Sequence, residues 1–134
     1  MGKAAEHAFC HLPDYEMKVR PLRDQLEDGI LSAIPNTELN GHKTQRLSNT
    51  TNITFRDIES EALLILLDQE GVCASSGSAC LADSDEPSHV VKAMNPESAA
   101  SRQIIRFSLG AGIQEADVAA TLQAVQQAVN ALRG

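Results

Sequence analysis

Two amphipathic helical patterns frame the chain. Apolar residues recur every three to four positions over residues 15–34 and again over residues 118–132, which is the spacing of a helix with one apolar face. Pro13 can open a new helix, whereas Pro21 lies inside the first pattern. Because a proline costs about 3 kcal/mol in a helix interior, we expect a kink there or a helix that starts near it. Residues 3–9 are helix formers without a cap, as if a helix had been cut from something longer.

Short strand candidates lie between the two helical patterns. Residues 49–55 are dense in β-branched side chains and alternate as a half-buried strand does. The other strand candidates are residues 37–39, 72–75 and 103–109. Two further helices are predicted at residues 62–70, which Gly71 closes, and at residues 88–94. This order predicts one domain over residues 1–134 with an α+β fold, in which a small, mostly antiparallel sheet has helices packed on one side.

Composition and charge argue against several classes of function. The 134 residues carry a net charge of −7 and the 11 lysines and arginines are scattered, which argues against binding to nucleic acid. The longest apolar run, residues 62–67, is far shorter than the roughly 20 residues of a membrane span, and the N-terminus has no signal pattern. Three cysteines at no familiar spacing suit a reducing compartment. We therefore expect a soluble, cytoplasmic protein.

A cysteine on a flexible tether is the strongest candidate for chemistry. Residues 74–80, with the sequence ASSGSAC, place Cys80 at the end of a run of small residues. A structural cysteine usually packs among apolar side chains, so a cysteine on such a tether is better placed to react. The residues expected to make the tether mobile are Ser76, Gly77, Ser78 and Ala79. The loop that they open, residues 76–86, is long enough to suggest a functional role.

Four separate blocks of sequence resemble one enzyme family. They are SSGSAC at residues 75–80, EPSHV at 86–90, IRFSLG at 105–110 and NTTNI at 49–53. In order and spacing they resemble the pyridoxal-phosphate-dependent cysteine desulfurases of the NifS/IscS type, within the class V aminotransferase family. The resemblance covers roughly residues 23–132 and corresponds to the C-terminal third of such an enzyme, its small domain.

The resemblance implies a chemistry divided between two domains. The large domain of the family holds pyridoxal phosphate on a lysine, and the small domain delivers a cysteine that takes sulfur from L-cysteine and leaves L-alanine. Cys80 matches that persulfide-forming nucleophile, and Arg106 matches the arginine that grips the substrate α-carboxylate. None of Lys3, Lys18, Lys43 and Lys92 lies in a setting like that of the family's cofactor lysine. We therefore expect no cofactor-binding residue here and an isolated chain without activity.

The same resemblance implies the partners. They are L-cysteine, a large cofactor domain that this chain lacks, and an iron–sulfur scaffold or another sulfur acceptor, with a homodimer expected for the full-length enzyme. Two other functions stay open from the sequence. The chain could be a stand-alone persulfide carrier or interaction module, or a related aminotransferase-fold protein whose cysteine is incidental.

Each candidate residue also has an ordinary structural explanation. Cys80 could be an incidental exposed thiol, and Arg106 could face solvent by strand alternation. We expect His89 to order the far end of the loop rather than to catalyse. Cys73, in a predicted strand, favours a packed core thiol. Cys10 lies near His7 and His11, but no further ligand is fixed with them, so no metal site is predicted.

Overall fold

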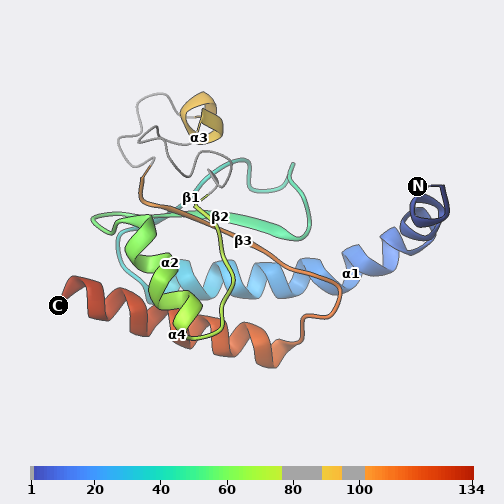
Figure 1. The fold of residues 1–134 in the computed structure, drawn as a ribbon. Helices are drawn as coiled ribbons and strands as arrows, with labels where there is room; N and C mark the ends of the chain where they lie inside the picture. The colour runs from blue at the N-terminus through green and yellow to red at the C-terminus, as the bar shows by residue number, and fades with distance from the viewer. Residues whose placement is uncertain (1, 77–88, 95–101) are drawn as a thin grey trace.

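The computed structural model describes residues 2–76, 89–94 and 102–134. Four helices and three strands follow one another in these residues (Figure 1). In chain order they are α1 (Gly2–Ala33), β1 (Thr37–Leu39), β2 (Thr50–Phe55), α2 (Ser60–Gln69), α3 (His89–Met94), β3 (Ile104–Ser108) and α4 (Glu115–Arg133).

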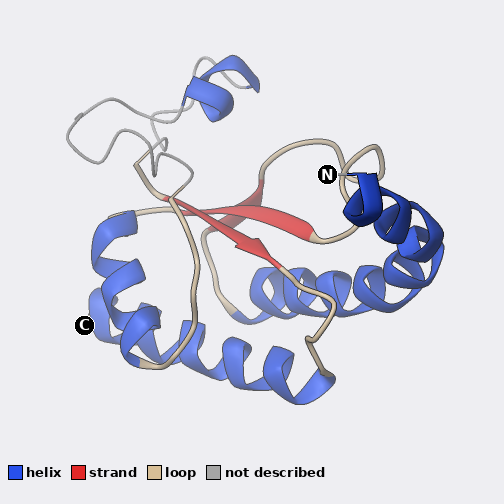
Figure 2. Cartoon of the chain, turned by 45° about the vertical axis from the view of Figure 1, so that its right-hand side comes forward, coloured by secondary structure: helices blue, strands red, loops and turns tan. Residues whose placement is uncertain are grey.

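The strands form an antiparallel sheet in the order β1-β2-β3. Leu39 is opposite Ile53, and Ile53 is in turn opposite Ile105, so β2 is the central strand. Helices α1, α2 and α4 lie on one side of the sheet, whereas the short α3 lies on the other side (Figures 1 and 2). This arrangement confirms the predicted α+β fold.

Strand alternation gives the sheet one apolar face and one polar face. Ile53, Phe55, Ile105 and Phe107 are buried in a core with apolar side chains of the helices. The helical contributions include Leu26, Ile30, Leu63, Leu67, Val125 and Val129. Burying each such side chain stabilises the fold by about 1.5–3 kcal/mol. Because successive strand residues point to opposite faces, the intervening residues lie on the face away from α1 and α4.

The first helix differs from its prediction. We expected a new helix at Pro13 and a kink or a start near Pro21, but α1 is one helix of 32 residues that contains both prolines. Val19 and Leu22, on either side of Pro21, are buried in the core, and this packing holds the helix across the proline. Pro21 itself is exposed, as is Met17 one turn earlier, so the carbonyl that loses its partner can be solvated.

The predicted strand at residues 72–75 is reduced to a single bridge at Ser75. The helix predicted at residues 62–70 is confirmed with its start shifted to Ser60, and Gly71 has the left-handed conformation expected after a helix, with φ of 77°. The other predicted elements are confirmed to within about two residues, which is the ordinary uncertainty of element ends.

Candidate functional site

The face of the sheet away from α1, α2 and α4 carries a cluster of polar side chains. Alternation along β2 and β3 places Thr50, Asn52, Arg106 and Ser108 there, with Thr50 opposite Ser108 and Asn52 opposite Arg106. Asn40, just after β1, joins them by donating from Nδ2 to Asn52 Oδ1 at 2.9 Å. This open polar face is the candidate substrate-binding surface of the domain.

Arg106 is the distinctive residue on this face. Its side chain is exposed although its neighbours Ile105 and Phe107 are buried, which is the pattern of a strand with one wet face. Other arginines of the chain, Arg20, Arg23, Arg46, Arg56 and Arg133, donate to carboxylates or backbone carbonyls. Among the residues that the structure describes, the guanidinium of Arg106 has no such acceptor. It is therefore available to an anionic ligand.

Ser75 fixes the start of the cysteine segment beside Arg106. The Ser75 N–H donates to the Arg106 carbonyl at 3.1 Å, and the Arg106 N–H donates to the Ser75 carbonyl at 2.6 Å. Cys80 follows five residues later, so an extended chain could place it at most about 18 Å from Ser75. Chain connectivity therefore limits how far Cys80 can lie from the strand that carries Arg106.

Other predicted site residues are only partly covered by the structure. Cys80, Gly77, Ser78 and Ala79 lie outside the described residues, and so does most of the predicted loop at residues 76–86. Ser76 is the one residue of that loop that the structure describes. His89 begins α3, as expected for a residue at the far end of that loop.

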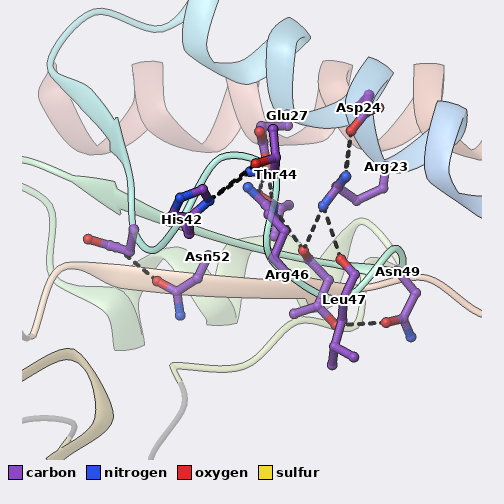
Figure 3. Close-up of polar contacts among 12 residues, drawn as sticks. Arg23, Asp24, Glu27, His42, Thr44, Arg46, Leu47, Asn49 and Asn52 are labelled. Atoms are coloured by element: carbon purple, nitrogen blue, oxygen red, sulfur yellow. Dashed lines mark hydrogen bonds and ion pairs between the residues drawn. The ribbon is translucent and has the colours of Figure 1, made fainter. Parts of the chain in front are cut away.

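A buried ion pair lies between α1 and the sheet, on the side opposite to the polar face. The Glu27 carboxylate, on α1, accepts hydrogen bonds from Arg46 Nη2 and from Thr51 Oγ1, each at 2.5 Å. Arg23, also on α1, donates from Nη1 to the carbonyls of Leu47 and Thr50 (Figure 3). These contacts hold the connection between β1 and β2 against α1, and so fix where β2 begins.

Cys73 contradicts its prediction. We expected a packed core thiol in a strand, but Cys73 is exposed, and residues 72–74 pair with no strand in the described part of the chain. Its side chain lines a cleft of about 390 Å³ between the end of α2, the end of β3 and the first turns of α4. The cleft opens beneath apolar side chains of the core, including Leu26 and Phe107, and is separate from Arg106.

Near the N-terminus, His7 and His11 form a local pair that does not include Cys10. The rings of His7 and His11 lie 4.1 Å apart, and His11 Nδ1 is 2.8 Å from the His7 carbonyl. Cys10 is exposed and free. In the described part of the chain, no three His, Cys, Asp or Glu side chains are grouped so that they could hold a metal ion.

The lysines of the described residues do not fit a pyridoxal phosphate site. Such a site needs a lysine that reaches the cofactor from within a pocket. Lys3 pairs with Glu6 on the surface, Lys18 donates to the Ala111 carbonyl at 2.8 Å, and Lys43 is exposed. None of these three lysines could anchor the cofactor where it stands.

Comparison with known proteins identifies the family. Residues 1–121 match the model of the aminotransferase class-V family, and the chain belongs to that family. Family membership implies pyridoxal phosphate as the cofactor of the whole enzyme. Across the described residues 2–76, 89–94 and 102–134, no helix is both long and apolar enough to cross a membrane.

The similar proteins are desulfurases of much greater length. The chain is 53% identical over 133 residues to Cysteine desulfurase 2 of Trichormus variabilis, covering 99% of this chain and 33% of that protein. It is 42% identical over 133 residues to Cysteine desulfurase NifS of Azotobacter vinelandii, with the same two coverages. The chain thus spans about a third of the length of the curated relatives it matches. These relatives do not favour the alternative of a stand-alone carrier.

Solved structures agree with the fold. A NifS-like protein from Rickettsia africae superposes with a TM-score of 0.75 at 28% identity, over 90% of this chain and 30% of that one. A second NifS-like protein superposes with a TM-score of 0.78 over 93% of this chain and 31% of that one. At 23% identity, this second likeness concerns the fold alone.

Sequence reasoning did not find the contribution of Asn40 and Asn52 to the polar face. Alternation in the NTTNI segment could have placed Asn52 on the same face as Thr50 and Thr54. Its position opposite Arg106 depends on the strand register, for which the sequence contains no direct signal.

Proposed function

We propose that this chain is the small, C-terminal domain of a NifS/IscS-type cysteine desulfurase that mobilises sulfur from L-cysteine. The observation that carries the proposal is the Arg106 guanidinium, which has no acceptor among the described residues and lies on a polar face beside the start of the Cys80 segment. The desulfurase names of the relatives support it. Because those proteins are about three times as long, the remaining residues of the active site belong to a large domain outside this chain.

Arg106 has the role of binding the substrate α-carboxylate. A guanidinium presents parallel N–H donors to the two oxygens of a carboxylate, which fixes the orientation of the substrate as well as its charge. The polar face supports this role because no carboxylate of the described residues pairs with Arg106 there. The amino acid is thereby held with its side-chain sulfur free to meet Cys80.

Cys80 has the role of sulfur acceptor. Its thiolate attacks the sulfur atom of bound L-cysteine, so that a sulfur–sulfur bond forms and the carbon–sulfur bond of the substrate breaks. The carbon that loses sulfur takes up a proton and leaves as L-alanine. Cys80 keeps the transferred atom as a persulfide, and a thiolate is the form of cysteine that performs such an attack.

The persulfide is then passed to an acceptor in the cytoplasm, such as an iron–sulfur cluster scaffold. Pyridoxal phosphate, which the family requires, is assigned to the large domain because the described lysines here do not fit it. The full-length enzyme is proposed to be a homodimer, and the chain by itself is proposed to be inactive.

A chimeric enzyme tests the proposal. The third of Cysteine desulfurase 2 from Trichormus variabilis that this chain matches would be replaced by this chain, and L-alanine and sulfide would be measured with L-cysteine and a reductant. We expect activity in the chimera and none from the chain alone with added pyridoxal phosphate. A folded, cofactor-loaded chimera that forms no L-alanine would refute the proposal.

A further inference from the structure

Asn52 and Arg106 are direct neighbours across two strands of the open polar face. They are opposite one another in the register of β2 and β3. The backbone N–H and the backbone carbonyl of Arg106 both bond to Ser75, on the side of β3 away from β2. Asn52 and Arg106 are therefore a non-hydrogen-bonded pair of the antiparallel sheet. In such antiparallel pairs the side chains come closest, with Cβ atoms about 4.5–5.5 Å apart. Groups at the ends of both side chains can therefore reach one small ligand.

A hydrogen-bond network fixes which way the Asn52 amide faces. Asn40 Nδ2 donates to Asn52 Oδ1 at 2.9 Å and to Thr54 Oγ1 at 2.9 Å, while Thr54 Oγ1 lies 3.2 Å from Asn40 Oδ1. The backbone N–H of Asn40 also donates to the Asn52 carbonyl at 2.9 Å. With its oxygen engaged as an acceptor, Asn52 has its nitrogen on the other side of the amide, away from that hydrogen bond (Figure 3).

The Asn52 amide thus places its N–H donors beside the Arg106 guanidinium, which has no acceptor among the described residues. In the part of the chain that the structure describes, Nδ2 of Asn52 donates to no protein group. A primary amide nitrogen carries two N–H donors, and a carboxylate offers about four lone-pair positions, of which a bidentate guanidinium uses two. One carboxylate can accept from both residues at once, whereas a cationic or purely apolar ligand would satisfy neither.

We propose that Asn52 is a second carboxylate-binding residue, donating from Nδ2 to the same small carboxylate that Arg106 holds. Asn40 is its positioning residue, because it engages Oδ1 and leaves Nδ2 directed at the ligand. This inference rests on the proposed function, in which that carboxylate is the α-carboxylate of the amino acid. It adds a residue on β2 to a site that the sequence assigns to β3 alone.

The test is a titration of the chain with L-alanine, followed by NMR of the Arg106 Nε–H and the Asn52 side-chain NH₂. L-Alaninamide, which lacks the carboxylate, is the control ligand at matched ionic strength. We expect both groups to shift along one binding curve with L-alanine and neither with L-alaninamide. The wild-type measurement needs no variant and so does not depend on whether a variant folds.

Variants then measure the contribution of Asn52. Asn52→Ala should weaken L-alanine binding about ten- to hundredfold, since a hydrogen bond to a charged group is the interaction lost. Asn130→Ala is the matched control, because Asn130 is exposed on α4, on the other side of the sheet. It should leave binding within about twofold of wild type, the range expected where no bond to a charged ligand is lost.

Different results would contradict the assignment of Asn52 and the carboxylate-binding role of Arg106. A response of Arg106 without one of the Asn52 NH₂, or an unchanged affinity in a folded Asn52→Ala variant, overturns the assignment of Asn52 and leaves the role of Arg106 standing. If the isolated chain shows no response, the same titration is made on the chimeric enzyme; absence of any Arg106 response there, at L-alanine concentrations that saturate its parent desulfurase, overturns the carboxylate site and the assignment of Asn52 together.

Discussion

Ser75 and Arg106 exchange two backbone hydrogen bonds, of 3.1 and 2.6 Å, at the edge of β3 that faces away from β2. The pair joins the segment that leads to Cys80 to the strand that presents Arg106. Ser75 precedes the proposed sulfur acceptor Cys80 by five residues, and Arg106 is the proposed carboxylate-binding residue. A displacement of β3 would therefore move Ser75 and Arg106 together.

Replacement of Arg106 in the chimeric enzyme tests the carboxylate role. Arg106→Lys should lower kcat/KM about tenfold or more, because an ammonium keeps the charge but loses the two parallel donors. Arg20→Lys is the matched control, since Arg20 pairs with Glu16 on the surface of α1, on the other side of the sheet from Arg106. Equal activity of Arg106→Lys and wild type would argue against a bidentate carboxylate contact.

The buried ion pair behind the polar face should dominate local stability. Glu27→Gln removes the charge that faces Arg46 where both side chains are almost fully buried, at 11% and 12% exposure. We expect a loss of about 2–4 kcal/mol in the free energy of unfolding, measured by urea denaturation of the chain. Glu38→Gln breaks an ion pair that is 55–57% exposed and should cost less than about 1 kcal/mol. Similar losses in the two variants would contradict the account of this network.

The end of α2 provides a test of backbone conformation. Gly71 has φ of 77° with no atom near the position of an added Cβ, so Gly71→Ala would be strained by its backbone alone. A loss of about 1 kcal/mol is expected. Gly110→Ala is the control, because Gly110 has open space and no positive φ. If thermal unfolding showed the same midpoint for Gly71→Ala and wild type, the left-handed end of α2 would be wrong.

The continuity of α1 can be tested at Pro21. Pro21→Ala restores a backbone N–H to a helix interior and should stabilise the chain by about 1–3 kcal/mol. Pro13→Ala should change stability by less, because residues 2–14 are exposed and pack against no described residue of the core. A neutral or destabilising Pro21→Ala would indicate that the helix begins at Pro21, where a proline is favourable.

The elements of this fold could be predicted because their residues carry local signals. The alternation of Ile105, Arg106 and Phe107 specifies a strand with one wet face, and the β-branched run ending at Phe55 specifies its neighbour. The continuity of α1 could not be predicted, because tertiary packing around Val19 and Leu22 overrides the local cost of Pro21. Local sequence does not report such packing.

The candidate site could be predicted only in part. The position of Arg106 on the polar face follows from alternation. Its pairing with Asn52 depends on register, which the contacts of Glu27 and Arg23 with the first two residues of β2 help to set. The exposure of Cys73 was missed because a short β-branched and apolar stretch predicts a strand whether or not a partner strand is present.

The central claim is that Cys80 accepts sulfur from L-cysteine. The most direct measurement is mass spectrometry of the Cys80 peptide from the chimeric enzyme after reaction with L-cysteine carrying an isotopic label on sulfur. We predict one labelled sulfur atom on Cys80, removable by a reductant, and loss of L-alanine formation in Cys80→Ser but not in Cys73→Ser. L-Alanine formation with an unlabelled Cys80, or with the label on Cys73, would contradict the account.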